Sequence, residues 1–440
     1  MTEGLESLTA IVTTDIAGIT RGRFVATKQL DKVAVSGIGW TPANISITPF
    51  GGIADPNPFG SAGDLKIMPD LVARFRTDQT GASMPFDMVP GNIVNLDGSP
   101  WPCCTRSMLR DAIARLREFA GLSVIAAFEQ EFQIFGADFP PAHVMSMAAL
   151  RRAGPFAPML MTGLEEAGVE PETILAEYGS DQFEVTHGPA PALVAADRAV
   201  AIREITRELA ENLGWKASFA PKTQADGVGN GVHIHFSLID GGGHPVAYDP
   251  SNPGNLSSIA GSFCAGIVRH LPALTAFTAA SVPSYYRLQP HHWSAAYTWL
   301  GEKDRESTLR ICPVSTVGGK DPARQYNIEY RAADATANPY LALAVIIQAG
   351  IEGIIANLPA PEIFSGDPAL LGDVEREEKG LLRLPGSLEN ALRAFEADEI
   401  AKNWFQPLFI STYLGEKRAE IKSLDGKDAQ QICDLYRTLF

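Results

Sequence analysis

Three separated segments of the chain each carry a pair of ionisable residues two positions apart within an apolar run. In the first, residues 124–132 read Val-Ile-Ala-Ala-Phe-Glu-Gln-Glu-Phe, an apolar stretch typical of a buried β-strand that holds Glu129 and Glu131. Because residues i and i+2 of a strand point to the same side, both carboxylates are expected on one face. Two carboxylates side by side need a cation between them, although a strand end in water would also account for the pair.

The second and third segments repeat this spacing with other residue types. His233 and His235 share one strand face behind a glycine-rich turn, so that one imidazole could bind a metal while the other handles phosphate or acts as a base. A pair of core histidines with satisfied hydrogen bonds is the alternative. Glu329 and Arg331 place a carboxylate and a guanidinium on one face, where an ordinary salt bridge would give the same pattern.

A fourth segment, residues 172–184, is acidic and could equally be a solvated loop. Together the four segments supply a set of five carboxylates and one imidazole: Glu129, Glu131, Glu177, Glu184, Glu329 and His233. A set dominated by oxygen donors suits magnesium or manganese better than zinc. Two such ions that bridge phosphate oxygens are a recurrent device of phosphoryl transfer, which the set therefore predicts.

The chain is acidic, with a formal net charge of -15. This charge argues against nucleic acid or an anionic membrane surface as a partner, because either needs a basic patch on the protein. Guanidinium groups are permanently charged and bind anions in a bidentate manner, so the arginines near the four segments are expected to bind a small anionic substrate. These arginines are Arg287, Arg305, Arg310 and Arg331.

The order of short strands and helices indicates an α+β protein. Short β-rich runs at residues 8–14, 23–26 and 93–95 alternate with turns, which predicts a small N-terminal domain. Apolar residues at helical spacing predict a helix at residues 105–121, and strong helices are also expected at residues 195–213 and 339–356. The five cysteines show no metal-ligand spacing, and the first thirty residues lack the pattern of a leader segment, so a soluble cytoplasmic protein is expected.

Six motifs occur in an order that resembles the glutamine synthetase family along nearly the whole chain. They are Glu-x-Glu-Phe at 129–132, Gly-x-x-Gln-x-Glu at 179–184, Asn-Gly-x-His-x-His-x-Ser-Leu at 230–238, Ser-Tyr-x-Arg-Leu at 284–288, Asp-Arg-Glu-Ser-Thr-Leu-Arg-Ile at 304–311 and Glu-x-Arg-x-x-Asp-x-x-x-Asn-Pro-Tyr-Leu at 329–341. The resemblance implies an α+β fold with a small N-terminal β-grasp domain at residues 1–102. A larger catalytic domain at residues 103–440 would contain a curved antiparallel sheet and flanking helices. Active sites would lie between neighbouring subunits of a homo-oligomeric ring, such as a dodecamer.

The resemblance also implies a role for each motif residue. A first metal site would use Glu131, Glu177 and Glu184, and a second would use Glu129, His233 and Glu329, for two or more Mg²⁺ or Mn²⁺ ions. ATP, as a substrate, would be bound by Glu172, His235, Ser237 and Arg310. The implied catalytic residues are Arg305, Arg331 and Glu129, and the amino-acid substrate would be bound by Arg287, Arg331 and Gly229. Glycine at this last position would let the backbone approach the substrate closely.

Two positions depart from the ammonia-using members of the family. Counting back from the shared Met-Pro-Asp at 68–70, their Asp-Gly-Ser-Ser loop falls on Phe50 and the three residues after it; counting forward from Arg287, their flap glutamate falls on Trp293. An amine site without these two acids should bind ammonium poorly and suits an organic amine. We therefore expect a ligase that activates a glutamate-like acid as an acyl phosphate, as in the γ-glutamyl-polyamine, alkylamide and anilide synthetases and the FluG proteins.

Other positions leave alternatives open. Val228 replaces an asparagine that contacts the α-amino group in ammonia-using members, so the acid could be glutamate or a close analogue. His291 and His292 could serve as bases, although neighbours in a strand would face opposite ways. The loop that some bacterial members use for adenylylation is shortened near residues 377–384, which argues against that regulation. The competing functions are ammonia-using glutamine synthetase, a non-catalytic nucleotide-binding ring protein, and a guanidino kinase.

Overall fold

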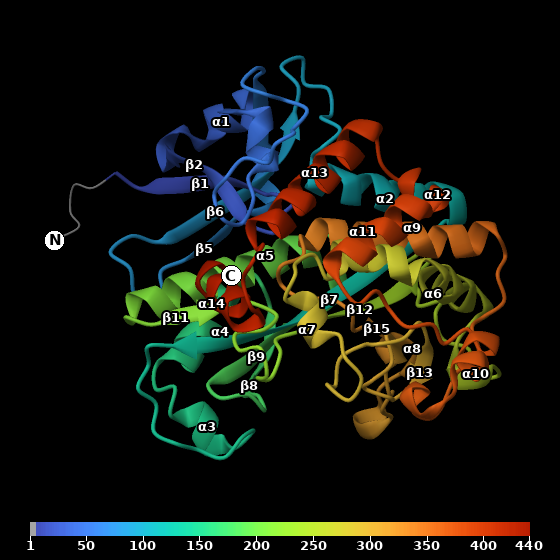
Figure 1. The fold of residues 1–440 in the computed structure, drawn as a ribbon. Coiled ribbons are helices and arrows are strands. Elements are labelled where there is room, and N and C mark those ends of the chain that lie inside the picture. Colours follow the sequence, from blue (N-terminus) through green and yellow to red (C-terminus); the bar gives the residue numbers. More distant parts are fainter. Residues whose placement is uncertain (1–5) are drawn as a thin grey trace.

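A computed structural model describes residues 6–440 and contains two sheets, with most helices beside the larger one (Figure 1). Residues 1–5 of the predicted N-terminal domain lie outside the described residues. The smaller sheet has the strand order β2-β1-β6-β4-β3, with β5 also paired to β6 and helix α1 (Leu30–Ser36) beside β4. Its strands are β1 (Leu8–Thr14), β2 (Thr20–Ala26), β3 (Ile38–Trp40), β4 (Leu65–Pro69), β5 (Phe75–Thr77) and β6 (Phe86–Val94). The strands predicted near residues 8, 23 and 93 are confirmed as parts of β1, β2 and β6.

The larger sheet joins strands that lie far apart in the sequence. Its order is β13-β14-β15-β12-β7-β9-β8, with β10 and β11 also paired to β7, and each of these pairs is antiparallel except β13 with β14. Its strands are β7 (Ser123–Phe135), β8 (Pro171–Ala176), β9 (Gln182–His187), β10 (Ala190–Pro191), β11 (Lys216–Ser218), β12 (Val232–Ile239), β13 (Leu300–Glu302), β14 (Leu309–Ile311) and β15 (Ile328–Tyr330). The expected antiparallel sheet is thus confirmed, with one parallel pair at its edge.

The two faces of the larger sheet differ in polarity because its long strands alternate. On β7, Phe128 and Phe132 are buried, whereas Glu129 and Glu131 are only partly covered. Strand β12 alternates in the same way, with Ile234 on the buried face between the two histidines. The register of β12 with β7 and β15 aligns the apolar residues of neighbouring strands on one face and the acids and histidines on the other.

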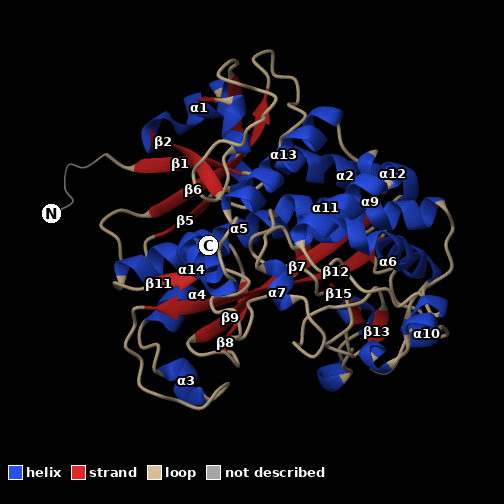
Figure 2. Cartoon of the chain, in the orientation of Figure 1, coloured by secondary structure: helices blue, strands red, loops and turns tan. Residues whose placement is uncertain are grey.

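A layer of helices covers the apolar face of this sheet (Figure 2). This layer includes α2 (Thr105–Ala120), α5 (Ala192–Asn212), α6 (Ser258–Thr278) and α9 (Pro339–Ile355). The other helices that follow α1 are α3 (Met147–Arg151), α4 (Phe156–Glu166), α7 (Ser284–Arg287), α8 (Pro322–Gln325), α10 (Asp373–Glu378), α11 (Leu388–Ala397), α12 (Glu399–Lys402), α13 (Pro407–Ser423) and α14 (Ala429–Leu439). Helix α5 packs on β7, and α9 packs on α2, α5 and α6. The predicted helices at 105–121, 195–213 and 339–356 are confirmed as α2, α5 and α9. Helix α6 is apolar and long enough to cross a membrane, but 72% of its apolar window is buried inside the protein, as in a core helix.

Buried polar contacts join the smaller sheet to the helical layer. Arg106 on α2 donates hydrogen bonds to the Asp197 carboxylate on α5 at 2.9 and 2.8 Å, and another to Asp70 beyond β4 at 2.9 Å. Asn338, which precedes α9, donates to the backbone carbonyl groups of residues 14 and 15 at 2.9 Å. Because removal of one buried partner leaves the others unsatisfied, these contacts fix the N-terminal sheet against the rest of the protein.

Helices α6 and α9 touch at their backbones. A Cβ atom on Gly266 of α6 would lie 2.0 Å from the Ala349 carbonyl oxygen on α9, and one on Gly353 would lie 2.0 Å from the Ser262 carbonyl oxygen. Gly266→Ala is therefore expected to separate the helices and destabilise the protein by about 1–3 kcal/mol, measured as a lower midpoint of thermal unfolding. Gly386→Ala is the control, since a Cβ there meets no atom within 4 Å. Equal midpoints for the two variants would contradict the close contact.

Candidate active site

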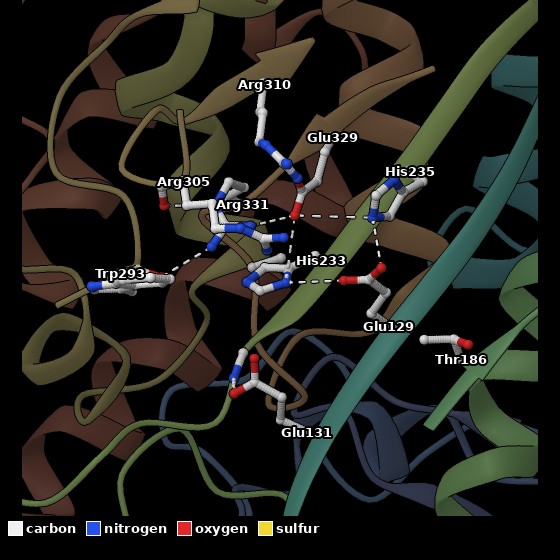
Figure 3. A network of polar contacts seen from close by, with 12 residues as sticks. Glu129, Glu131, Thr186, His233, His235, Trp293, Arg305, Arg310, Glu329 and Arg331 are labelled. Atoms are coloured by element: carbon white, nitrogen blue, oxygen red, sulfur yellow. Dashed lines mark hydrogen bonds and ion pairs between the residues drawn. The ribbon is translucent and has the colours of Figure 1, made fainter. Parts of the chain in front are cut away.

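Three strands of the larger sheet bring Glu129, His233 and Glu329 together on its polar face (Figure 3). The register of β12 sets His233 opposite Glu129, and His235 opposite Glu329. His233 Nδ1 lies 3.3 Å from Glu129 Oε2 and 3.5 Å from Glu329 Oε1. One imidazole nitrogen and two carboxylates at these separations could hold a divalent cation. They are the residues that the family resemblance implies for the second metal site.

A second group of possible ligands lies beside the first. Donor atoms of Glu131, Glu184 and His233 lie within 4.8 Å of one another, and the register of β7 with β9 sets Glu131 opposite Glu184. The Gly231 backbone N–H donates to Glu131 Oε2 at 2.8 Å and holds that carboxylate in place. Glu177, predicted as the third ligand, lies in the turn between β8 and β9 and is not a member of this group within residues 6–440.

Crowded negative charge perturbs the acids of this second group. Burial, followed by the charges of Glu129, Glu131 and Glu177, raises the pKa of Glu184 to about 9. Burial and the charge of Glu131 likewise raise the pKa of Glu177. With its pKa at about 9, the Glu184 carboxyl retains a proton at neutral pH unless a cation offsets the surrounding charge. The donor set therefore fits a divalent cation, and its oxygen-rich composition fits Mg²⁺ or Mn²⁺.

Glu329 is the centre of the polar network. Its side chain is 1% exposed, and it accepts a hydrogen bond from Arg310 Nη1 at 2.8 Å and another from Arg331 Nη1. Burial alone would raise the pKa of Glu329, but the charges of His233 and Arg331 hold it at about 2. The carboxylate is thus ionised at neutral pH. Glu329 and Arg331 therefore lie on one side of the strand, as expected, and they form the ion pair that the sequence left as an alternative.

His235 links the network to two residues that sequence reasoning missed. Its Nε2 lies 3.0 Å from Glu129 Oε1, and its Nδ1 lies 2.8 Å from Asn327 Oδ1 and 3.7 Å from Cys312 Sγ. Burial lowers the pKa of His235, but the contacts with Cys312 and Glu129 raise it well above its ordinary value. Asn327 stands two positions before Glu329, so the same spacing could have identified it. No comparable sequence signal marks Cys312.

Arg287, at the end of α7, is a buried cation. It donates hydrogen bonds to the carbonyl oxygens of Ala333 at 3.1 Å and Arg331 at 3.3 Å, and its Nη2 lies 3.4 Å from His233 Nε2. Burial lowers its pKa, and within residues 6–440 no carboxylate forms an ion pair with it. Since a buried guanidinium without a counter-ion is costly, this side chain is suited to bind an anionic group of a substrate.

Gly229 packs directly against this arginine. A Cβ atom at residue 229 would lie 2.9 Å from Arg287 Cγ and 3.0 Å from the Pro221 carbonyl oxygen. The absence of a side chain thus lets Arg287 pass beside the turn. This gives Gly229 a packing role in addition to the substrate approach that the sequence predicts.

The remaining predicted residues lie around the network. Ser237 follows His235 on the same face of β12. Arg305 is exposed, and its carbonyl oxygen accepts a hydrogen bond from Arg331 Nε at 3.0 Å. Glu172 is exposed on β8, and in the described part of the chain no hydrogen bond or ion pair joins it to the network. Of the residues predicted for ATP, His235 and Arg310 thus belong to the network, whereas Glu172 does not contact it in the described part of the chain.

The two positions predicted to face the amine make different contacts in the described part of the chain. The Phe50 ring packs edge-on against Tyr436 of α14, with 5.7 Å between the ring centroids. The Trp293 side chain is 71% exposed, while its carbonyl oxygen accepts a hydrogen bond from Arg331 Nη2 at 3.0 Å. Among residues 6–440, no aromatic contact joins Phe50 to Trp293.

Residues 291–293 form a loop and not a strand. His291 and Trp293 have positive φ angles of 63° and 51°, so the two-residue alternation of a strand does not apply to His291 and His292. His291 Nε2 lies 2.7 Å from Asp367 Oδ2, and this contact raises the pKa of His291.

The chain matches known sequence families along most of its length. The family described as the glutamine synthetase N-terminal domain matches residues 3–101, and the glutamine synthetase catalytic domain matches residues 102–436. A γ-glutamylpolyamine synthetase of Streptomyces coelicolor, GlnA3, is 34% identical over 432 residues, which cover 96% of this chain and 91% of the relative.

Solved structures agree with the fold over the same length. A structure described as a novel glutamine synthase homolog has a TM-score of 0.92 and 44% identity, and covers 99% of each chain. A structure of GmaS in complex with ADP has a TM-score of 0.80 and 25% identity, and covers 96% of this chain and 95% of that one.

Proposed function

Because the chain belongs to the glutamine synthetase family and is a ligase of that family, we propose that it joins the γ-carboxylate of glutamate, or of a close analogue, to an organic amine at the expense of ATP. The observation that carries the proposal is the polar face of the larger sheet, where two groups of carboxylates meet His233 beside buried arginines. The S. coelicolor relative, named a γ-glutamylpolyamine synthetase, supports an organic amine as the second substrate.

In this proposal the two ligand groups hold the cations. Glu129, His233 and Glu329 would hold one ion. Glu131 and Glu184 would hold another, and Glu177, from the turn between β8 and β9, would be its third ligand. Bound there, Mg²⁺ or Mn²⁺ would neutralise phosphate oxygens and stabilise negative charge on the transferred group. The raised pKa of Glu184 supports cation binding, since a bound cation beside this carboxyl would lower its pKa and let it ionise.

The buried arginines would bind the anionic parts of the substrates. Arg287 would pair with the α-carboxylate of the amino acid, which supplies the counter-ion that this buried cation lacks. Arg331 and Arg305 would bind the transferred phosphoryl group, and Arg310 would bind ATP together with Glu172, His235 and Ser237. Bidentate guanidinium groups suit both carboxylate and phosphate.

The reaction then has two steps. The γ-phosphoryl group of ATP moves to an oxygen of the side-chain carboxylate, giving ADP and an acyl phosphate, while the arginines stabilise the negative charge that spreads over the moving group. A neutral amine attacks the carbonyl carbon, phosphate leaves, and the nitrogen loses a proton as the amide forms. Phe50 and Trp293, where ammonia-using members carry acids, support an amine with apolar surface.

We also propose a domain boundary between residues 102 and 103, a cytoplasmic location, and a homo-oligomeric ring such as a dodecamer. The two family matches meet at residues 101 and 102, which supports the boundary.

Phosphate release from ATP with magnesium and glutamate tests the proposed function, with ammonium, methylamine, isopropylamine, putrescine or aniline as the amine. We expect one organic amine to exceed ammonium in kcat/KM by at least about tenfold, the discrimination that an apolar site commonly gives. Mass spectrometry of the products should show the matching γ-glutamyl amide. Chelation with EDTA should abolish turnover, and Mg²⁺ or Mn²⁺ should restore it.

The other outcomes assign the protein differently. Turnover with ammonium alone would show a glutamine synthetase. Phosphorylation of an acceptor without an amide product would show a kinase. ATP binding without turnover of any of the amines, with glutamate or its close analogues as the acid, would support a non-catalytic nucleotide-binding protein and reject the proposed function.

A further inference from the structure

The loop at residues 289–294 has a backbone conformation that its sequence does not favour. His291 and Trp293 both have positive φ, a region that bulky L-residues rarely adopt. Such conformations persist only where surrounding contacts offset their cost. Packing of the indole supplies little of this stabilisation, because the Trp293 side chain is 71% exposed.

The carboxylate of Glu306 accepts the backbone N–H groups of both residues with positive φ. Its Oε2 accepts a hydrogen bond from the His291 backbone N–H at 3.1 Å, and its Oε1 accepts one from the Trp293 backbone N–H at 2.6 Å. Glu306 stands in the loop between β13 and β14, and its own N–H donates to Asp304 Oδ1 at 2.9 Å. Backbone N–H groups that converge where φ is positive form a concave anion site. Here the anion is a side chain of the protein itself.

The opposite side of the Trp293 backbone is tied to the polar network. Its carbonyl oxygen accepts a hydrogen bond from Arg331 Nη2 at 3.0 Å, and Arg331 also pairs with Glu329 (Figure 3). The backbone of Trp293 is thus held between Glu306 at its N–H and Arg331 at its carbonyl group. Since the indole has little packing of its own, these two contacts set its position beside the candidate active site.

We propose that Glu306 is a positioning residue of the amine site, which holds residues 291–293 so that Trp293 presents its ring to the amine. This inference rests on the proposed function, in which Trp293 takes the place of the flap glutamate. The role belongs to the carboxylate and not only to the size of the side chain, because each oxygen accepts one N–H group. Glutamine, with one acceptor oxygen and one donor NH₂ group, cannot replace both contacts.

Hydrogen exchange of the full-length protein without substrates directly tests the contacts of Glu306 with the backbone of residues 291 and 293. Glu306→Gln is expected to speed exchange of the peptide that covers residues 289–294 by at least about tenfold, because a charge-assisted hydrogen bond is lost. Glu302→Gln is the matched control, since Glu302 is exposed on β13 and pairs with Lys303 at 3.0 Å. This control should leave the exchange unchanged. Unchanged exchange in Glu306→Gln would overturn the proposal, regardless of which amine the enzyme uses as a substrate.

Kinetics test the consequence for the amine. In Glu306→Gln we expect the KM for the amine to rise about tenfold, with kcat and the KM for ATP changed by less than about threefold, because only the position of the indole is lost. Equal increases in the KM for ATP and for the amine would overturn the positioning role. If the wild-type protein turns over no amine, the proposed function fails while hydrogen exchange still decides whether Glu306 holds the loop.

Putrescine and aniline separate positioning from direct charge attraction. Putrescine is a cation at neutral pH, as the amine of lysine is, whereas aniline is neutral. Similar relative losses in kcat/KM for both amines support Glu306 as a positioning residue. A loss confined to putrescine would show that the carboxylate attracts the ammonium group itself and would overturn the proposal.

Discussion

Replacing Glu329 by glutamine is expected to lower kcat for amine-dependent ATP turnover by at least about a hundredfold, the scale of losing preorganised transition-state electrostatics. Glu329 is buried, pairs with Arg310 and Arg331, and lies 3.5 Å from His233 Nδ1. Glutamine keeps the size of the side chain but removes the charge that would hold a cation and balance the two guanidinium groups. The measurement is the steady-state rate at saturating ATP, magnesium, glutamate and amine.

Glu352→Gln is the matched control for this loss. Glu352 also pairs with an arginine, Arg115, at 2.8 Å, but this pair joins α9 to α2 on the helical side of the sheet. The control should keep its rate within about twofold of wild type, because partly exposed ion pairs contribute little. Circular dichroism should show that Glu329→Gln is folded. A folded Glu329→Gln variant with a rate within about threefold of wild type would refute the role of Glu329 in catalysis.

The residue pairs at a spacing of two were predictable because a strand's side-chain period follows from its covalent geometry. Glu129 and Glu131 therefore share one face of β7, as His233 and His235 share one face of β12. Helix α2 was predictable for a similar reason, since apolar residues at helical spacing mark its buried side. The family resemblance, and not periodicity, implied which residues form each ligand set.

The pairing between strands is not contained in these local patterns. His233 lies opposite Glu129 because β12 pairs antiparallel with β7 along its whole length, Val232–Ile239. Burial of the apolar residues on one common face sets that register. The same packing brings Glu184 of β9 opposite Glu131. Sequence spacing can thus propose the ligands, whereas tertiary packing decides the distances between them.

The loops were least predictable because contacts from elsewhere set their conformation. The backbone at His291 and Trp293 takes positive φ while Glu306, from a separate loop, accepts both of their N–H groups. A side chain that bonds the backbone of another loop leaves no periodic trace in the sequence. The predicted contact of Phe50 with the amine has the same limitation, since within one chain its ring lies on Tyr436.

Gly231→Ala is expected to raise the KM for glutamate by at least about tenfold, because it displaces the side chain proposed to bind the substrate carboxylate. A Cβ atom at residue 231 would lie 2.4 Å from Arg287 Nη2 and 3.1 Å from His233 Nε2. The guanidinium is the end of a flexible side chain, so it can move without unfolding the turn. Movement would, however, break its hydrogen bonds to Ala333 and Arg331. Initial rates over a range of glutamate concentrations give the KM.

Two other glycine-to-alanine substitutions serve as controls for Gly231→Ala. Gly241→Ala should leave the KM unchanged, because a Cβ there meets no atom within 4 Å. In Gly229→Ala the new Cβ would also press on the Pro221 backbone carbonyl, at 3.0 Å, so thermal stability should fall together with activity. In Gly231→Ala the KM for glutamate should rise while the unfolding midpoint and the KM for ATP stay near wild type. A variant that keeps the wild-type KM for glutamate would show that Arg287 does not bind the acid, and the buried guanidinium would then require another anionic partner.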